Sequence, residues 1–258
     1  MQHGSRIELF ALPGIPDVHE GDDLGMLIAA AIKRLGETLR DGDILVVAHK
    51  VISKSEGRVV RLGEMTPGTR ACGIAALLGK DPRKVQAILD ESEEIVRVAR
   101  TKTAGAIIAR HRHGWVSANA GVDESNVGQE DAILLLPLDP DESARQLADA
   151  IEGWCGVRPG IVVTDTFGRA WRRGLLNVAI GLCGIPAIVD LIGTEDAYGR
   201  RLAVTQQALA DEIAAASGLL MLKSARRPVV LVRGIEWHPA AAVSARDYVR
   251  PVQEDLFR

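Results

Sequence analysis

The sequence predicts an α+β fold in which mixed, largely antiparallel sheets carry flanking helices. Short strand patterns follow one another closely between residues 96 and 136, which suits antiparallel pairing better than helical crossovers. Helical patterns flank this stretch, the clearest at 24–35, where apolar residues recur on one face. We therefore predict two closely packed subdomains within one unit spanning 1–258, with a possible boundary in the proline-rich connector at 137–141.

The first half of the chain alternates strand and helix patterns. Residues 7–10 form an apolar strand pattern, and Asp22-Asp23 is expected to cap the helix that follows. The run ILVVAH at 44–49 predicts a buried strand. Thr66-Pro67 and Asp81-Pro82 each predict a helix start, because a capping side chain precedes a proline suited to the first helical position.

The second half predicts two longer helices and two strands. One helix begins at about Asp141, and a longer one runs from about 204 to 222. The apolar runs at 161–163 and 229–234 predict buried strands. The acidic cluster DESEEI at 90–95 predicts a helix end exposed to solvent.

Composition excludes several function classes. The formal net charge of −3 and an aromatic content of 3% argue against a nucleic-acid-binding surface. The chain has neither a signal-peptide pattern nor an apolar run of membrane-spanning length, so we expect no membrane partner. Three widely spaced cysteines favour reduced thiols, and hence a cytoplasmic protein, over a disulfide framework.

The stretch IVVTDTFGRAWRRGLLNVAI at 161–180 is the strongest functional signal. A predicted strand is followed by hydroxyl, carboxylate and guanidinium side chains: Thr164, Asp165, Thr166, Arg169, Arg172 and Arg173. Hard oxygen ligands suit Mg²⁺ or Mn²⁺, and guanidinium groups suit phosphate oxygens. The pattern favours a metal–nucleotide phosphate site over the alternative of a structural turn followed by a solvated basic loop.

Other polar motifs are ambiguous when taken alone. The segment VISKSEGR places Lys54 at an expected strand-to-turn edge, where an ordinary exposed lysine is the favoured interpretation over a phosphate ligand. His111 and His113 have no third ligand nearby and have arginines beside them, which disfavours a metal site.

The loop NAGVDESNVG at 119–128 is rich in oxygen atoms, including those of Asp123 and Asn126. Such a loop is either a set of hydrogen-bonded turns or part of a metal site. The chain contains neither a GxxxxGK[ST] loop nor a GxGxxG motif after a strand, so a bound nucleotide would be held in some other way.

Ten segments resemble, in order and spacing, the coenzyme F420-0:L-glutamate ligase family, the gamma-glutamyl ligases of deazaflavin cofactor biosynthesis. They are EGDDL (20–24), DGDILVV (41–47), VISKSEGR (51–58), ESEEI (91–95), NAGVDESNV (119–127), LLLPLDPD (134–141), TDTFGRAWRRG (164–174), VAIG (178–181), ADEIAAA (210–216) and VVLVRG (229–234). The resemblance covers nearly the whole chain and is to the stand-alone form, which lacks a C-terminal flavin-binding domain.

The resemblance implies a homodimeric ligase that uses GTP and divalent metal ions, Mg²⁺ or Mn²⁺, with K⁺ as a further candidate. Its partners would be GTP, L-glutamate and F420-0. By motif position the metal ligands would be Asp123, Asp165 and Thr166. The nucleotide contacts would be Ile15, Pro16, Asp17, Val18, His49, Lys50, Lys54 and Asn126. This reverses the interpretation of Lys54 as an ordinary surface lysine.

The implied chemistry is transfer of the GTP γ-phosphate to a carboxylate of the acceptor, followed by attack of the glutamate amine on the acyl phosphate. We expect Asp165, Lys54, Arg169 and Arg172 to carry catalysis. A metal-dependent phosphohydrolase and a catalytically silent nucleotide-binding homologue are the alternatives. One departure concerns the second metal ion, which a glutamate after the long helix helps to hold in archaeal members of the family. Leu222-Lys223 stands where those members have Gly-Glu, and a lysine cannot ligate Mg²⁺ at neutral pH.

Overall fold

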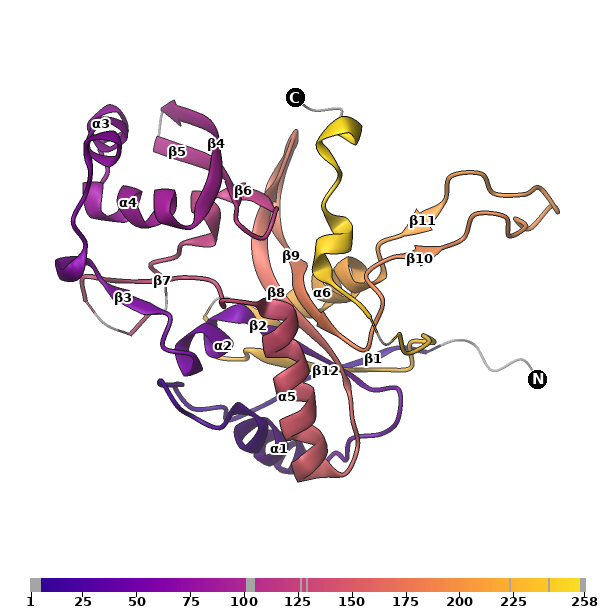
Figure 1. Ribbon diagram of the computed structural model, residues 1–258. Coiled ribbons are helices and arrows are strands. Elements are labelled where there is room, and N and C mark those ends of the chain that lie inside the picture. Colours follow the sequence, from indigo (N-terminus) through magenta and orange to yellow (C-terminus); the bar gives the residue numbers. More distant parts are fainter. Residues whose placement is uncertain are drawn as a thin grey trace.

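The computed structural model describes residues 6–100, 105–125, 127–128, 130–222, 224–240 and 242–255 (Figure 1). The helices in these ranges are α1 (Leu24–Leu35), α2 (His49–Ser55), α3 (Thr69–Leu78), α4 (Pro82–Asp90), α5 (Pro140–Cys155) and α6 (Leu209–Met221). The strands are β1 (Glu8–Ala11), β2 (Ile44–Ala48), β3 (Val59–Arg61), β4 (Ser92–Arg100), β5 (Gly105–His111), β6 (Val116–Ala118), β7 (Ala132–Leu134), β8 (Gly160–Arg169), β9 (Arg172–Cys183), β10 (Val189–Asp190), β11 (Gln206–Gln207) and β12 (Val229–Arg233).

A five-stranded sheet in the order β1-β12-β2-β8-β9 forms the centre of the fold. Every neighbouring pair is antiparallel except β2 and β8, which run parallel from Ile44 opposite Gly160 to Ala48 opposite Thr164. The smaller sheets β3-β7, β4-β5-β6 and β10-β11 are antiparallel. The predicted α+β class with mixed, largely antiparallel sheets is therefore confirmed.

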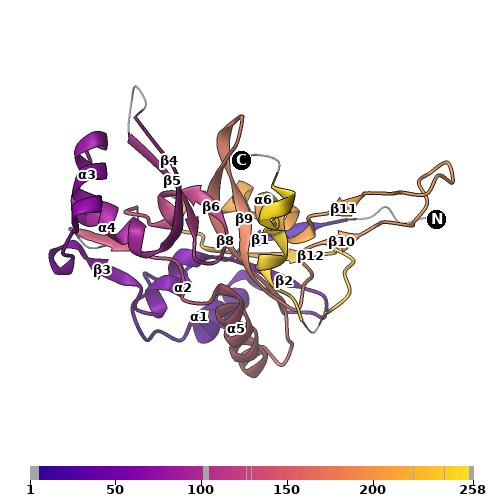
Figure 2. The ribbon, with the colours of Figure 1, turned by 45° about the horizontal axis from the view of Figure 1, so that its top comes forward.

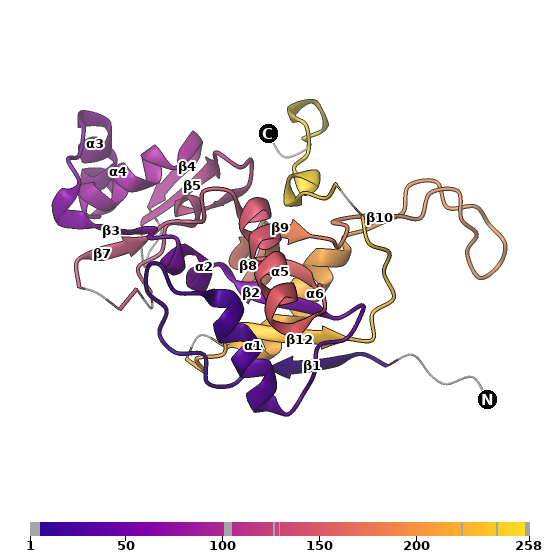
Figure 3. The ribbon, with the colours of Figure 1, turned by 60° about the horizontal axis from the view of Figure 1, so that its bottom comes forward.

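Helices cover both faces of the central sheet. Helix α5, with α1 beside it, lies on one face, and α6 lies on the other (Figure 2, Figure 3). The approach of α1 to α5 requires a glycine, because a Cβ on Gly25 would lie 2.6 Å from the Cβ of Ala150. The strands β2 and β12, and the first half of β8, run between these layers, which explains why their sequences are almost continuously hydrophobic there.

Local capping signals place several helix starts correctly. The side chain of Asp23 accepts a hydrogen bond at the start of α1, and Asp81 does the same for α4, with Pro82 in the first turn. Asp139 caps α5, which begins one residue before the predicted start.

Two predicted helix starts are wrong. Helix α3 is capped by Gly68, whose amide donates to the side chain of Gln86, rather than by Thr66. Helix α6 starts at Leu209 rather than 204, because the residues before it pair as β11 with β10. In both cases a longer-range contact overrides the local signal.

The buried apolar residues form one main cluster and three smaller ones, and the chain passes between them at two places. The largest cluster combines residues from Leu12 to Ile52 with residues from Leu136 to Ala245, and includes Trp115. The stretch 62–135 forms three smaller clusters. The chain returns to the main cluster at Leu136, beside the predicted boundary at 137–141. It leaves that cluster between residues 52 and 62, a place that was not predicted.

The strands β10 and β11 and the loop joining them form an arm that extends away from the body of the molecule (Figure 1, Figure 3). The loop includes Tyr198, which is almost fully exposed. None of the helices in the described ranges is both long and apolar enough to cross a membrane.

Candidate functional site

A cavity of about 1190 Å³ lies at the edge of the central sheet where β2 ends beside β8. It contains most of the residues that sequence analysis assigned to a site. These are Ile15, Pro16, Asp17, Val18, His49, Lys50, Lys54, Asp123, Asp165 and Thr166. Asn126, the remaining predicted nucleotide contact, lies outside the described residues, as does Lys223.

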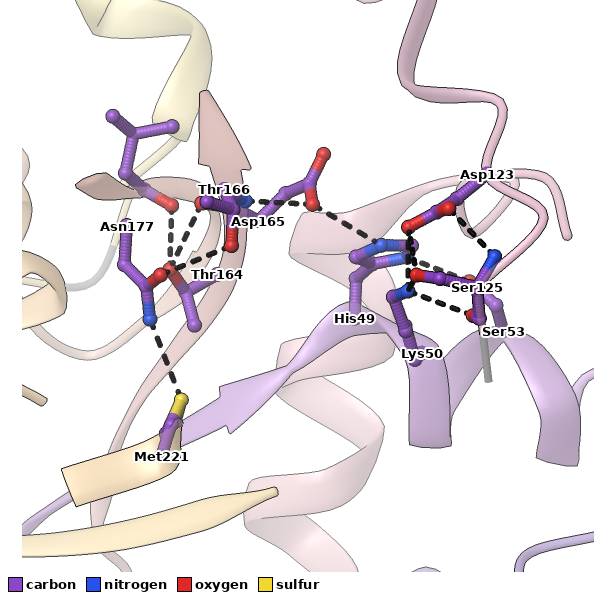
Figure 4. Close-up of polar contacts among 11 residues, drawn as sticks. His49, Lys50, Ser53, Asp123, Ser125, Thr164, Asp165, Thr166, Asn177 and Met221 are labelled. Carbon is purple, nitrogen blue, oxygen red and sulfur yellow. Dashed lines mark hydrogen bonds and ion pairs between the residues drawn. The ribbon is translucent and has the colours of Figure 1, made fainter. Parts of the chain in front are cut away.

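The parallel pairing of β2 with β8 brings His49 to Asp165. Ala48 is opposite Thr164, so the residues that follow each of them reach the same edge of the sheet. The Nε2 atom of buried His49 lies 3.3 Å from Oδ1 of Asp165, without hydrogen-bond geometry, and its Nδ1 lies 3.2 Å from Ser53 Oγ (Figure 4). The amide of Thr166 donates to Asp165 Oδ1 at 2.6 Å.

Asp165 lies within a strand and not, as predicted, in the residues after one. Strand β8 continues past the end of β2 and pairs with β9 as a long hairpin, so both Asp165 and Thr166 are held by backbone pairing. Lys54 also differs from its expected setting, because VISKS forms most of the short helix α2. The helix explains how Lys50 and Lys54, four residues apart, reach the same cavity.

Lys50 holds the predicted metal ligand Asp123 across 73 residues of sequence. Its Nζ donates to Asp123 Oδ2 at 2.5 Å, and to the backbone oxygen and hydroxyl of Ser125 at 2.9 and 2.6 Å (Figure 4). Burial alone would raise the pKa of Asp123, but Lys50 and Ser125 outweigh this effect and lower it to about 2. Asp123 is therefore ionised at neutral pH.

The second lysine lies in an environment that disfavours its charge. Burial lowers the pKa of Lys54, Asp17 acts in the opposite direction, and the neighbouring charge of Lys50 lowers it further. A phosphate near both ammonium groups would relieve their mutual repulsion, so this part of the cavity suits an anion.

Asn177 is a site residue that sequence analysis missed. Its Oδ1 accepts a hydrogen bond from Thr166 Oγ1 at 3.1 Å, and its Nδ2 lies 3.4 Å from the sulfur of Met221 at the end of α6 (Figure 4). A two-residue turn at 170–171 alone would place Leu175 opposite Thr166. The shift in register between Gly168 and Arg169 places Asn177 there instead, so no simple sequence signal identified this pair.

The structure does not bring Arg169 and Arg172 to the cavity. Both lie at the far end of the β8–β9 hairpin, outside the residues that line it. Arg169 Nη2 donates instead to the backbone oxygen of Arg173 at 2.9 Å. Cations that do line the cavity include Arg61, Arg226 and Arg227, of which only the last two lie in a segment that sequence analysis could recognise as basic.

His111 and His113 belong to a buried polar cluster and not to the cavity. His111 Nε2 lies 3.3 Å from the carboxylate of Glu91, which also pairs with Arg58 at 3.1 Å and Arg112 at 3.0 Å. Burial alone would raise the pKa of Glu91, but His111 and these arginines lower it. The prediction that residues 90–95 are a solvated helix end is therefore wrong at Glu91.

Hydrogen bonds assign a neutral form to His113. Its Nε2 lies 3.4 Å from the backbone oxygen of Pro137, a possible acceptor, and its Nδ1 faces a donor, Arg246 Nη2, at 3.2 Å. Burial and then the neighbouring His111 lower the pKa of His113 from 6.5 to about 4. A second proton on the ring would face the guanidinium of Arg246.

We expect the free energy of unfolding to fall as the pH drops from 6.5 to 4. The unfolded chain binds a proton at His113 in this interval and the folded chain does not. This difference lowers the free energy of unfolding by up to about 1.4 kcal/mol for each pH unit. Urea unfolding at several pH values should show a smaller loss for His113→Gln, whose amide can keep both hydrogen bonds, than for wild type. His238→Gln, at an exposed position, is the matched control; equal losses for wild type and His113→Gln would contradict the expectation.

Comparison with known proteins identifies the family. The sequence model of F420-0:Gamma-glutamyl ligase matches residues 14–234. The chain is 42% identical over 255 residues to the coenzyme F420:L-glutamate ligase of Methanothermobacter thermautotrophicus, covering 98% of this chain and 99% of that protein. It is 44% identical over 254 residues to the coenzyme F420:L-glutamate ligase of Archaeoglobus fulgidus, covering 98% and 97%. The chain therefore belongs to the F420-0:gamma-glutamyl ligase family and is a ligase, as the resemblance implied.

Proposed function

We propose that this enzyme joins L-glutamate to coenzyme F420-0 in a reaction driven by GTP and dependent on divalent metal ions. The names of its relatives support the acceptor and the amino acid. The observation that carries the proposal is the meeting of Asp123 and Asp165 with Lys50 and Lys54 in one cavity. Carboxylates to hold a cation beside ammonium groups to hold phosphate are what a metal-bound nucleoside triphosphate requires.

The oxygen donors fit Mg²⁺ or Mn²⁺. The described residues contain no group of three or more His, Cys, Asp or Glu side chains placed to hold an ion. Mg²⁺ is usually bound by one or two carboxylates together with substrate phosphates and water, so two aspartates and Thr166 suit a cation that arrives with a nucleotide. Cations held by Asp123, Asp165 and Thr166, with K⁺ as a further candidate, would supply positive charge at the transferring phosphoryl group.

In the first step, an acceptor carboxylate oxygen attacks the γ-phosphorus of GTP, the bond to the bridging oxygen breaks, and GDP leaves. Lys50 and Lys54 hold the phosphates and oppose the negative charge that develops on them. The glutamate amine then attacks the acyl carbon, inorganic phosphate departs with the electron pair of the broken carbon–oxygen bond, and the amine loses a proton. The backbone amide of Thr166 donates to Asp165 and keeps this carboxylate oriented, while His49 packs beside it.

Mass spectrometry of the purified protein with F420-0, glutamate, GTP and Mn²⁺ tests this proposal. Glutamylated product in the complete mixture, and none when GTP or glutamate is omitted, is the expected result. Loss of GTP without product would favour the phosphohydrolase. GTP binding without turnover would favour a silent homologue.

We infer further that the enzyme acts as a cytoplasmic homodimer, as the resemblance implies. Light scattering of the purified protein should then give twice the chain mass of 27.7 kDa. A mass of 27.7 kDa at assay concentration would contradict the dimer.

A further inference from the structure

Three exposed leucines lie at the cavity on the side of α6. Leu175 on β9 is 58% exposed, Leu219 on α6 is 78% exposed, and Leu222 just after α6 is 60% exposed. All three line the cavity. Exposed leucines scattered singly are ordinary, but three at one cavity wall form a surface suited to an apolar ligand.

This wall lies apart from the charged residues proposed to hold GTP. Asn177 and Met221 lie on one side of Asp165 in the close-up view, and Lys50 and Asp123 lie on the other (Figure 4). Gly218 lets α6 approach Asn177, since a Cβ there would lie 3.3 Å from the amide carbon. Leu219 and Leu222 lie within two residues of Met221 along the chain, which places them with α6 on this side of Asp165.

The backbone after α6 is held in an unusual conformation. Leu222 has a φ of 37° and Arg226 a φ of 51°, values that side chains other than glycine rarely adopt. Both residues line the cavity. Strained residues cluster at ligand sites, because the surrounding structure must hold them against their preferred conformation.

Two arginines complete the wall. Arg226 and Arg227 line the cavity, and neither forms an ion pair with a carboxylate of the described chain. Leucines next to unpaired guanidinium groups match a ligand that combines an apolar ring with an anionic group.

The volume of the cavity leaves room for such a ligand. Pockets for one small molecule usually occupy roughly 300–1,000 Å³, and this one measures about 1190 Å³. A nucleotide at the lysines and aspartates would leave the wall beside α6 for a second substrate.

We propose that Leu175, Leu219, Leu222, Arg226 and Arg227 form the acceptor subsite, in which the leucines cover the aromatic ring system of the acceptor and the arginines bind its anionic tail. This inference rests on the proposed ligase function and deepens it. Asp165, where we propose that the phosphoryl group is transferred, lines the same cavity as this subsite.

Steady-state kinetics of Leu219→Ser and Arg227→Gln test the subsite. We expect the KM for F420-0 to rise at least about tenfold, which is the factor that a loss of about 1.4 kcal/mol produces, while the KM for GTP changes less than about twofold. Leu77→Ser, at an exposed leucine on α3 outside the cavity, is the matched control and should behave as wild type. Titration of F420-0 without GTP, followed by its own fluorescence, should show the same weakening.

The outcomes separate the two proposals. If wild-type protein forms no glutamylated product, the proposed function fails. If wild type ligates but both variants keep the wild-type KM for F420-0, or weaken GTP binding equally, the subsite is overturned. A changed oligomeric mass of Leu219→Ser by light scattering would overturn it too, because the wall would then be covered by a second copy of the chain.

Discussion

Asp165→Asn is expected to lower kcat/KM for glutamate ligation by at least about 10³-fold, equivalent to roughly 4 kcal/mol of transition-state stabilisation. The substitution keeps the size of the side chain but removes the negative charge needed to hold a cation at the phosphoryl group. Asp165 also accepts the amide hydrogen of Thr166, so the asparagine oxygen can preserve the local backbone while the charge is lost. The measurement is initial rate of product formation with F420-0, glutamate, GTP and Mn²⁺.

Two further measurements make this result specific. Binding of Mn²⁺ in the presence of GTP, followed by electron paramagnetic resonance, should weaken in Asp165→Asn. Asp149→Asn on the exposed face of α5 should retain wild-type activity. An Asp165→Asn protein that unfolds like wild type and ligates at full rate would refute the role of this carboxylate.

Glu91→Ala is expected to lower the free energy of unfolding by about 3–5 kcal/mol, as removal of one partner from a buried ion pair does. Glu91 is 5% exposed and pairs with Arg58 and Arg112 beside His111. Arg58 also donates to the backbone oxygen of Leu136 at 2.9 Å. This arginine therefore ties together the two places where the chain passes between the main apolar cluster and the clusters of 62–135.

Urea unfolding at pH 7 measures this effect. Glu93→Ala, two residues along and exposed, is the matched control and should change the free energy of unfolding by less than about 0.5 kcal/mol. A loss below about 1 kcal/mol in Glu91→Ala would show that the buried arginines find other partners and that the cluster does not hold the two parts together.

Local sequence determined much of the architecture. Asp23 and Asp81 cap helices because a side-chain carboxylate satisfies backbone amides within its own turn, which needs no distant residue. The apolar runs that became β2 and β12 were recognisable because strands buried on both faces have no polar positions. The ten family segments contain four of the predicted residues that line the cavity, Lys54, Asp123, Asp165 and Thr166, and the wider resemblance to the family supplied the others before any geometry was known.

Tertiary structure decided which of these residues meet. No pattern within 49–55 reveals that Lys50 reaches Asp123, or that β2 pairs in parallel with β8 and so brings His49 to Asp165. From local sequence, every acidic residue in 90–95 is expected to be exposed to solvent. Glu91 is buried because it pairs with Arg58 and Arg112, which come from elsewhere in the chain. Arg169 and Arg172 were separated from the cavity by the length of the β8–β9 hairpin. Capping and apolar patterning act over a few residues and can be predicted from sequence, whereas charge pairing and cavity shape depend on contacts that form only when the sheet assembles.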